Sequence, residues 1–192
     1  MINMKSELKK DRRNKIIIAS AKIFSKNGYN NTKTSEISKE AGIAAGTLFN
    51  YFPTKIDLLN KTYEEVMLDL IKIIKSNKET TLKNKLRHFW NKTIDYYIEK
   101  PYFIDFIIIF ENSPLISNEI HEKLNLNNKY ITEILGNTKE NDEDTFELIP
   151  NIILSTLFST FKFIEKHPKE DIEHIKEISF DYLYNGINIS TK

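Results

Sequence analysis

The chain is most informative over residues 16–59, which read IIIASAKIFSKNGYNNTKTSEISKEAGIAAGTLFNYFPTKIDLL. Apolar residues recur here every three or four positions, which is typical of helices with one buried face. Each run ends at a residue that stops a helix, namely Gly28, Gly42 and Pro53, because glycine accepts the left-handed backbone beyond a helix end and proline cannot continue a helix. The spacing predicts helices over residues 11–27, 34–41, 45–52 and 55–75.

A very tight turn joins the second and third of these helices, which is the pattern of a helix-turn-helix. Thr34 is expected to cap the second helix through its hydroxyl. The third helix starts with small side chains at Ala44, Ala45 and Gly46, which let the backbone approach another surface closely. The free N–H groups at such a helix start favour a phosphate. The turn and its small residues therefore predict a surface that binds nucleic acid.

Hydroxyl and ammonium groups surround this predicted surface. Thr47 adds a donor at the start of the third helix, and the Tyr51 phenol follows one turn later. Lys55 begins the next helix, where its charge opposes the helix dipole by a few tenths of a kcal/mol. An anion opposite Lys55 would offset that cost. Lys33 and Thr34 supply a second phosphate-binding point at the start of the second helix.

These residues resemble the DNA-binding region of the TetR family of bacterial transcriptional regulators. The resemblance is ungapped and covers about a quarter of the chain. The positions that fit the family pattern are Ile16, Ala19, Ile23, Phe24, Gly28, Tyr29, Thr34, Ile37, Ala41, Gly42, Gly46, Thr47, Leu48, Tyr51, Phe52, Lys55, Leu58 and Leu59. An all-helical remainder and the total length are also those of the family.

The resemblance implies an all-α homodimer of about nine helices per chain. Residues 1–55 would form a three-helix DNA-binding domain, and residues 56–192 a helical domain for effector binding and dimerisation. Each subunit would place residues 45–52 in the major groove of a palindromic operator. By position, Lys33, Thr34, Thr47, Tyr51 and Lys55 would contact phosphates, Ala45, Gly46 and Phe49 would face base edges, and Asn50 would add one polar contact.

Three residues depart from the family pattern. Ala44 stands where a serine N-cap is usual, which removes about 1 kcal/mol of capping. Phe49 replaces a frequent tyrosine, and Ser20 replaces a frequent alanine. Few polar groups then remain to read base edges, since Ala45 and Phe49 offer only apolar contact with thymine methyls. The sequence favours recognition through phosphates and DNA shape, on an AT-rich palindrome.

Eight aromatic residues crowd into residues 89–110. Most are expected to fill a core, and some to line an apolar effector pocket. The candidates for the pocket are Trp90, Tyr97, Phe106 and Phe110, with Asn91 or Tyr130 as polar handles. A hydrophobic or aromatic effector is expected, and a cationic one is an option because Asp95, Asp105 and Glu111 lie in the same region.

The last two predicted helices, about residues 145–166 and 169–188, are expected to pair with their symmetry copies as a four-helix bundle. The apolar surface for this contact would come from Ile152, Ile153, Thr156, Leu157, Thr160 and Phe161. A helix buried within its own subunit would account for part of the same pattern.

Charge is divided unevenly along a chain whose net charge is only +1. Residues 1–55 carry 11 Lys and Arg against 4 Asp and Glu, whereas residues 56–192 carry 17 against 23. The basic segment suits a polyanion. At its start, Lys5, Lys9, Lys10, Arg12 and Arg13 are expected to contact DNA non-specifically or simply to be solvated.

Composition excludes several other classes. The chain has no cysteine, which removes thiol nucleophiles and Cys-ligated zinc. Its four histidines are scattered, and it has neither a Gly-rich phosphate loop nor a nucleophile elbow. No enzymatic activity, metal or cofactor is therefore expected. The N-terminus is too polar for a signal peptide, and the densest apolar run, residues 106–110, is too short to span a membrane, so a soluble cytoplasmic protein without a membrane partner is expected.

The sequence therefore predicts a repressor that a small molecule releases from its operator. The alternative is a protein with the same DNA-binding module that responds to a protein partner and has no small effector.

Overall fold

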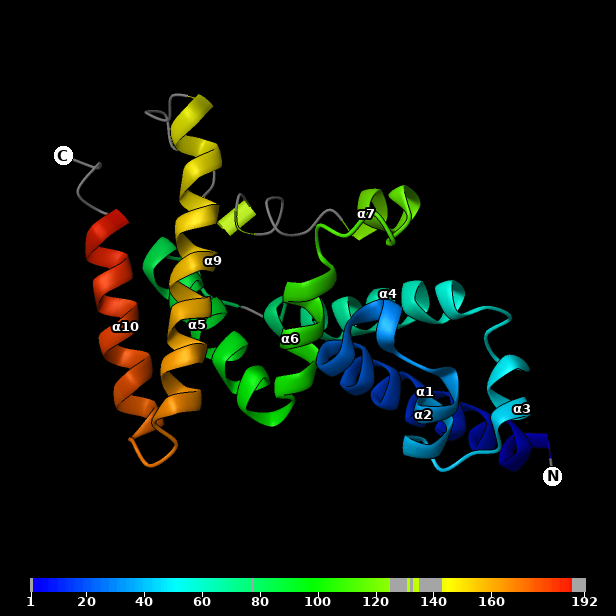
Figure 1. Cartoon of the computed structure of the whole chain (residues 1–192). Coiled ribbons are helices and arrows are strands. Elements are labelled where there is room, and N and C mark those ends of the chain that lie inside the picture. The colour runs from blue at the N-terminus through cyan, green and yellow to red at the C-terminus, as the bar shows by residue number, and fades with distance from the viewer. Residues whose placement is uncertain (1, 77, 125–130, 132, 135–142, 188–192) are drawn as a thin grey trace. The chain divides into compact units, whose positions relative to one another are not determined.

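The computed structural model in Figure 1 describes residues 2–76, 78–124, 131, 133–134 and 143–187. Within these residues the chain forms nine helices and no strand, which confirms the predicted all-α class. The helices are α1 (Ile2–Asn31), α2 (Thr34–Glu40), α3 (Ala45–Phe49), α4 (Lys55–Ile74), α5 (Leu82–Glu99), α6 (Pro101–Phe110), α7 (Asn118–Leu124), α9 (Glu143–Lys166) and α10 (Ile172–Ile187).

The chain divides into two compact units. The first contains Met1–Ile71 and Lys100–Leu124, and the second contains Lys72–Glu99 and Asn125–Lys192. Helices α6 and α7 thus belong to the same unit as the three N-terminal helices. A functional boundary at residue 55 stays a prediction, because compact packing and functional division are separate properties.

An aromatic cluster forms the core of the first unit, where α1 packs against α6. The Phe24 ring is fully buried, and its centroid lies 6.3 Å from that of Phe106 and 6.1 Å from that of Phe110. Tyr63 of α4 adds a ring whose centroid is 6.4 Å from that of Phe106. These contacts join α1, α4 and α6 behind the predicted DNA-binding helices.

Helix α1 is longer than predicted. It begins at Ile2 rather than near residue 11, since the first ten residues contain no helix breaker. The predicted stop at Gly28 is confirmed, because its φ of 69° and ψ of 173° interrupt the helix. Arg13, expected to be solvated or to contact DNA, instead forms an ion pair with Glu65 of α4, and its guanidinium carbon lies 5.5 Å from the centroid of the Phe52 ring.

In the second unit, α10 packs against both α5 and α9. Trp90 of α5 is fully buried, and its indole Nε1 donates a hydrogen bond of 3.2 Å to Ser179 Oγ. The Tyr97 ring stacks on Phe161 of α9, with centroids 4.4 Å apart. Aromatic side chains therefore hold all three helices together.

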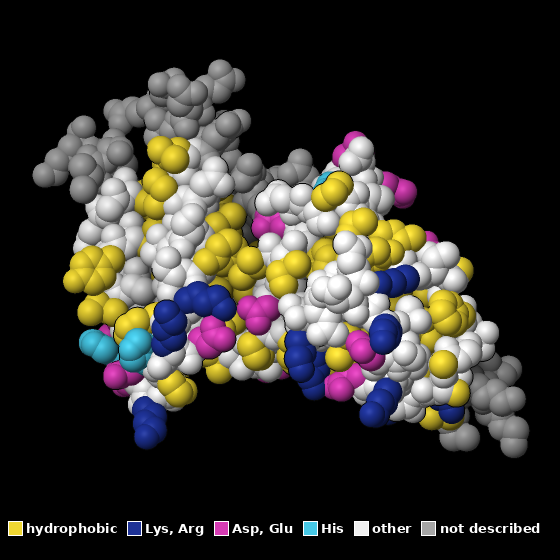
Figure 2. All heavy atoms as spheres, in the orientation of Figure 1, with side chains coloured by type: hydrophobic (Ala, Val, Ile, Leu, Met, Phe, Trp, Pro, Cys, Tyr) yellow, Lys and Arg dark blue, Asp and Glu magenta, His cyan; other side chains and the backbone are white. Residues whose placement is uncertain are grey.

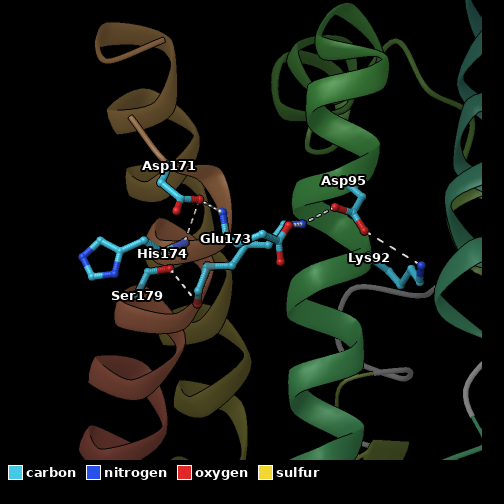
Figure 3. A network of polar contacts seen from close by, with 7 residues as sticks. Lys92, Asp95, Asp171, Glu173, His174 and Ser179 are labelled. Carbon is cyan, nitrogen blue, oxygen red and sulfur yellow. Dashed lines mark hydrogen bonds and ion pairs between the residues drawn. The ribbon is translucent and has the colours of Figure 1, made fainter. Parts of the chain in front are cut away.

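A buried lysine links α5 and α10 in the second unit. Lys176 bonds to Asp95 of α5 and, at 2.6 Å, to Glu173, in the network shown in Figure 3. Burial alone would lower the pKa of Lys176, but its hydrogen bonds to the two carboxylates outweigh burial and raise that pKa. Asp95 also lies 3.8 Å from Lys92, so it already has counter-charges and is a poor candidate to bind a cationic effector.

Helix α9 is unusually apolar. Among the described residues, the Leu148–Lys166 segment is the one candidate long and apolar enough to span a membrane, with a mean hydropathy of 1.2. A core helix of a globular protein passes the same test, so this property by itself does not indicate a membrane.

Candidate nucleic-acid interface

The turn between α2 and α3 is built from backbone hydrogen bonds. The Gly42 N–H donates to the Lys39 carbonyl at 3.1 Å, and the Ile43 N–H donates to the Ser38 carbonyl at 3.0 Å. This pair of bonds is the Schellman arrangement that ends many helices. It requires a left-handed residue after the helix, and Gly42 supplies it with a φ of 68°. The predicted role of this glycine is confirmed.

Polar contacts fix the start of α2 against the end of α1. The buried Thr32 hydroxyl donates to the Gly28 carbonyl at 2.6 Å, and Asn27 Nδ2 donates to Glu36 Oε2 at 3.1 Å. The prediction that Thr34 caps α2 is wrong, because the N-cap is Lys33 and makes no side-chain cap bond. Thr34 is instead the first residue of the helix.

Helix α3 is shorter than predicted and ends at Phe49 rather than Phe52. The N–H groups of Tyr51 and Phe52 both donate to the Leu48 carbonyl at 3.0 Å, so the chain tightens after Phe49. Pro53 prevents the helix from continuing any further, because a proline disfavours helical backbone in the residue before it, here Phe52. At the other end of α3, Ala44 provides no side-chain cap, as predicted.

The predicted DNA-contacting residues all reach the solvent. Lys33, Ala45, Gly46, Phe49 and Asn50 are exposed, and Thr34, Thr47, Tyr51 and Lys55 are partly exposed. The opposite sides of the two helices are closed, since Ile37 of α2 and Leu48 of α3 are 0% exposed. Because the apolar faces of the two helices pack inward, their small and polar residues face solvent. Phe49 lies on this outer side too and is 47% exposed, although it is a large aromatic residue.

A capping box, which was not among the predicted features, starts α4. Thr54 Oγ1 accepts a bond of 3.1 Å from the Asp57 N–H, while Asp57 Oδ2 accepts bonds from the Thr54 N–H at 3.1 Å and the Thr54 hydroxyl at 2.7 Å. A Thr followed three residues later by an acidic residue is the signal that could have shown it. The box fixes the backbone on which Lys55 sits.

Lys55 has an internal partner. Its Nζ lies 4.4 Å from the centroid of the Tyr29 ring, a cation–π distance. Partial burial lowers the pKa of Lys55. The ammonium group is thus held beside the turn, and substitution of Lys55 would disturb packing as well as charge.

The predicted effector residues fall into different units. Trp90 and Tyr97 belong to the core of the second unit, whereas Phe106 and Phe110 belong to the core of the first. Tyr130 lies outside the described residues. The effector site stays a prediction, and one new observation bears on it: on α5, the Nε2 atom of His88 and the Oδ1 atom of Asn91 are enclosed without a hydrogen-bond partner in the described structure.

No metal-binding cluster occurs in the part of the chain that the structure describes, where no group of three or more His, Cys, Asp or Glu side chains converges.

An exposed helix-turn-helix at the start of an all-helical chain defines a class of DNA-binding proteins. Comparison with known proteins narrows that class. Residues 16–62 match the family described as "Bacterial regulatory proteins, tetR family". The regulator QacR of Staphylococcus aureus is 34% identical over 128 residues, which are 62% of this chain and 64% of QacR.

Two solved structures share the fold over nearly the whole chain. A TetR family transcription regulator from Marinobacter aquaeolei superposes with a TM-score of 0.79 at 18% identity, over 94% of this chain and 97% of the other. The regulator FadR from Bacillus subtilis, in complex with stearoyl-CoA, has a TM-score of 0.65 at 23% identity, over 88% and 96%.

Residues 16–62 therefore carry the N-terminal domain of the TetR family of bacterial regulatory proteins, and the fold of the chain is the one that solved TetR-family structures share. Its matches span about a quarter to two thirds of the length of the first curated relatives. These relatives are named as regulators, not as enzymes.

Proposed function

We propose that this protein is a homodimeric transcriptional repressor that binds a palindromic operator through α2 and α3 and leaves it when a small hydrophobic molecule binds. The observation that carries the DNA-binding part is the outward-facing surface of α2 and α3. Its small and polar residues face solvent while Ile37 and Leu48 anchor it from behind. Action on chromosomal DNA implies a cytoplasmic location.

The experiment that tests this proposal is a gel-shift assay with the DNA upstream of the protein's own gene. A sequence-dependent shift that weakens as salt rises is expected, because bound phosphates release counterions. The same complex is then titrated with stearoyl-CoA as the first hydrophobic probe, and release of the DNA is expected. A protein that shifts no neighbouring intergenic fragment would rule out the proposal, whereas DNA binding that no hydrophobic probe relieves would favour control by a protein partner.

Gly46 provides a sharper test of the same surface. A Cβ atom added to Gly46 would meet nothing within 4 Å, so the subunit itself does not require glycine there. Glycine within a helix costs about 1 kcal/mol relative to alanine. The absence of a side chain on an exposed helix is therefore best explained by the close approach of a partner, which here is DNA.

Gly46→Ala is expected to act in opposite directions on stability and on DNA binding. It should raise the free energy of unfolding by about 0.5–1 kcal/mol, measured by urea denaturation. Because the added methyl group would meet the DNA, affinity should fall about tenfold or more in a fluorescence anisotropy assay. Equal DNA affinity in the two proteins would show that Gly46 does not face the duplex.

The proposed dimer surface consists of apolar side chains that the subunit leaves uncovered. On α9, Leu148 is 56% exposed and Ile152 41%; on α10, Ile178 is 45% exposed and Tyr182 76%. The spacing of four residues within each pair places its two members on one side of the helix, and hydrophobic side chains lie open over both helices on the face in Figure 2. By contrast, Ile153, Leu157, Thr160 and Phe161 of the predicted surface are buried within the subunit.

Replacing both Ile178 and Tyr182 with Lys is expected to convert the dimer to a monomer. The new lysines would face their own copies across a two-fold interface and repel them. The interface would also lose the apolar contacts of the two replaced side chains. Sedimentation velocity measures the change, and operator affinity should fall with it because a palindrome is bound by two subunits. Replacing the exposed Glu177 with Lys is a control for added positive charge on α10. If the wild-type protein sediments as a monomer, the proposed dimer is wrong.

The proposed effector site includes the polar atoms on α5. The enclosed His88 Nε2 and Asn91 Oδ1 atoms lie three residues apart, on one side of the helix. A buried polar atom without a partner costs about 1–3 kcal/mol, so a ligand that hydrogen-bonds to both would recover that cost. A hydrophobic effector with one polar group is the chemistry that suits these atoms and the aromatic residues near them in sequence.

A further inference from the structure

A polar pocket lies at the corner where α6 gives way to α7, within the first unit. Its lining includes Glu111, Asn112, Ser113, Ile116, Asn118 and His121. The pocket has a volume of about 370 Å³ and opens to solvent. That volume is near the lower limit for small-molecule sites, which start at about 300 Å³, so a small ligand fits it best.

Glu111 is the charged group of this pocket. Its side chain is half-buried, and its backbone N–H donates to the Ile107 carbonyl at 2.8 Å. Within the described residues its carboxylate has neither a hydrogen bond nor an ion pair. Burial raises the pKa of Glu111, which is the effect expected for a carboxylate that has lost water and gained no partner. The described part of the protein thus places an acid in this pocket and no counter-charge beside it.

Other acids that could attract a cation already have partners. The Glu64 carboxylate on α4 forms ion pairs with Lys61 Nζ at 2.6 Å and with Lys123 Nζ at 2.5 Å. Asp95 forms an ion pair with Lys176. Asp105 also has an interaction partner. Of the three acids that the sequence offered to a cationic ligand, Glu111 alone is available in the described structure.

The groups around Glu111 are held in place. The His121 ring packs edge-on against Tyr63 of α4, with centroids 6.0 Å apart. Asn60 of α4 ties down the connecting loop, since its Nδ2 donates to the Leu115 carbonyl at 2.9 Å and its Oδ1 accepts from the Ser117 N–H at 2.8 Å. A pocket whose walls are fixed loses little freedom when a ligand binds.

We propose that this pocket binds a small organic cation, a protonated primary amine, with Glu111 as its counter-charge. The side-chain oxygens of Asn112, Ser113 and Asn118 supply further acceptors for an ammonium group, which has three N–H donors. A tightly held metal ion is disfavoured, because no group of three or more His, Cys, Asp or Glu side chains converges among the described residues. An anion would be repelled by Glu111. The site is separate from the predicted DNA surface and does not depend on the proposed repressor function.

Isothermal titration calorimetry of the full chain with n-butylamine at pH 8 tests the proposal, with n-butanol as the uncharged probe of similar shape. Saturable binding is expected for the amine at up to about 20 mM, and none for the alcohol. Glu111→Gln should weaken amine binding about tenfold or more. Glu122→Gln, which removes the same charge from an exposed position on α7 outside the pocket lining, should leave the affinity unchanged.

Absence of saturable amine binding to the wild-type protein, or equal binding to Glu111→Gln, would overturn the proposal. If Glu111→Gln does not fold, the NMR signals of the His121 imidazole decide the matter in the wild-type protein. They should shift and saturate with n-butylamine and stay fixed with n-butanol, and their failure to shift would count against the site. DNA binding is measured separately on the same preparations, so its failure would reject the repressor function without affecting this result.

Discussion

Lys33→Glu is expected to weaken operator binding about 100-fold at physiological salt. This is the largest effect on DNA affinity that we expect from a single substitution. Lys33 is exposed at the start of α2, where it would meet a phosphate. A dimer carries the substitution twice, so two attractions are lost and two repulsions are introduced. Fluorescence anisotropy at several salt concentrations should also give a plot of log Kd against log salt concentration whose slope is lower by about two than that of the wild type.

Lys78→Glu is the matched control for this change. Lys78 is an exposed lysine in the second compact unit, so the variant has the same net charge and leaves the DNA surface intact. It should bind the operator within about twofold of the wild type at physiological salt. If both variants lose affinity equally, net charge rather than a contact at Lys33 explains the loss. Lys55→Glu is a poorer test, because it also removes the ammonium group from the Tyr29 ring.

Phe106→Ala is expected to lower the free energy of unfolding by about 3–5 kcal/mol, the largest effect on stability. The Phe106 ring is fully buried and its centroid lies 4.9 Å from that of Phe110, with Phe24 and Tyr63 close by. Its removal would leave a cavity where α1, α4 and α6 meet. Such a loss is a large part of the 5–15 kcal/mol that stabilises a typical domain.

Urea denaturation followed by circular dichroism measures this loss, at one protein concentration because a dimer's stability depends on concentration. Ile109→Ala is the control on the same helix, since Ile109 is 47% exposed and its truncation should change stability by about 0.5 kcal/mol or less. The experiment also separates two interpretations of Phe106. If the free energy of unfolding falls by less than about 1 kcal/mol, the ring is not an important part of the core, and its predicted contact with an effector becomes the better interpretation.

The helix-turn-helix could be predicted almost completely, because its signals are local. Gly28 and Gly42 adopt the positive φ values that were expected, and Ile37 and Ala41, four residues apart, are both buried as their spacing indicated. The errors lie at helix ends, at Thr34 and after Phe49, where a residue's neighbours along the chain compete for the same backbone hydrogen bonds. The Thr54–Asp57 capping box was equally local and was overlooked.

Side-chain partners could not be predicted, because they depend on residues far away in the sequence. Arg13 was assigned to a solvated or DNA-binding segment, but Glu65 holds it. Asp95 was offered to a cationic ligand, but Lys176 reaches it from 81 residues away. Composition reveals which charges exist, whereas only packing determines which of them are neutralised.

The periodicity and turn residues of this chain were enough to indicate its all-helical class and its helix-turn-helix, though not every helix end, since hydrogen bonds within a helix join residues only a few positions apart. Packing between helices then settled which aromatic residues share a core and, among the described residues, left Glu111 without a counter-charge in its pocket. Such contacts join α5 to α10 or α1 to α6, and no local pattern records them, because the free energy of a buried contact depends on every helix that closes around it.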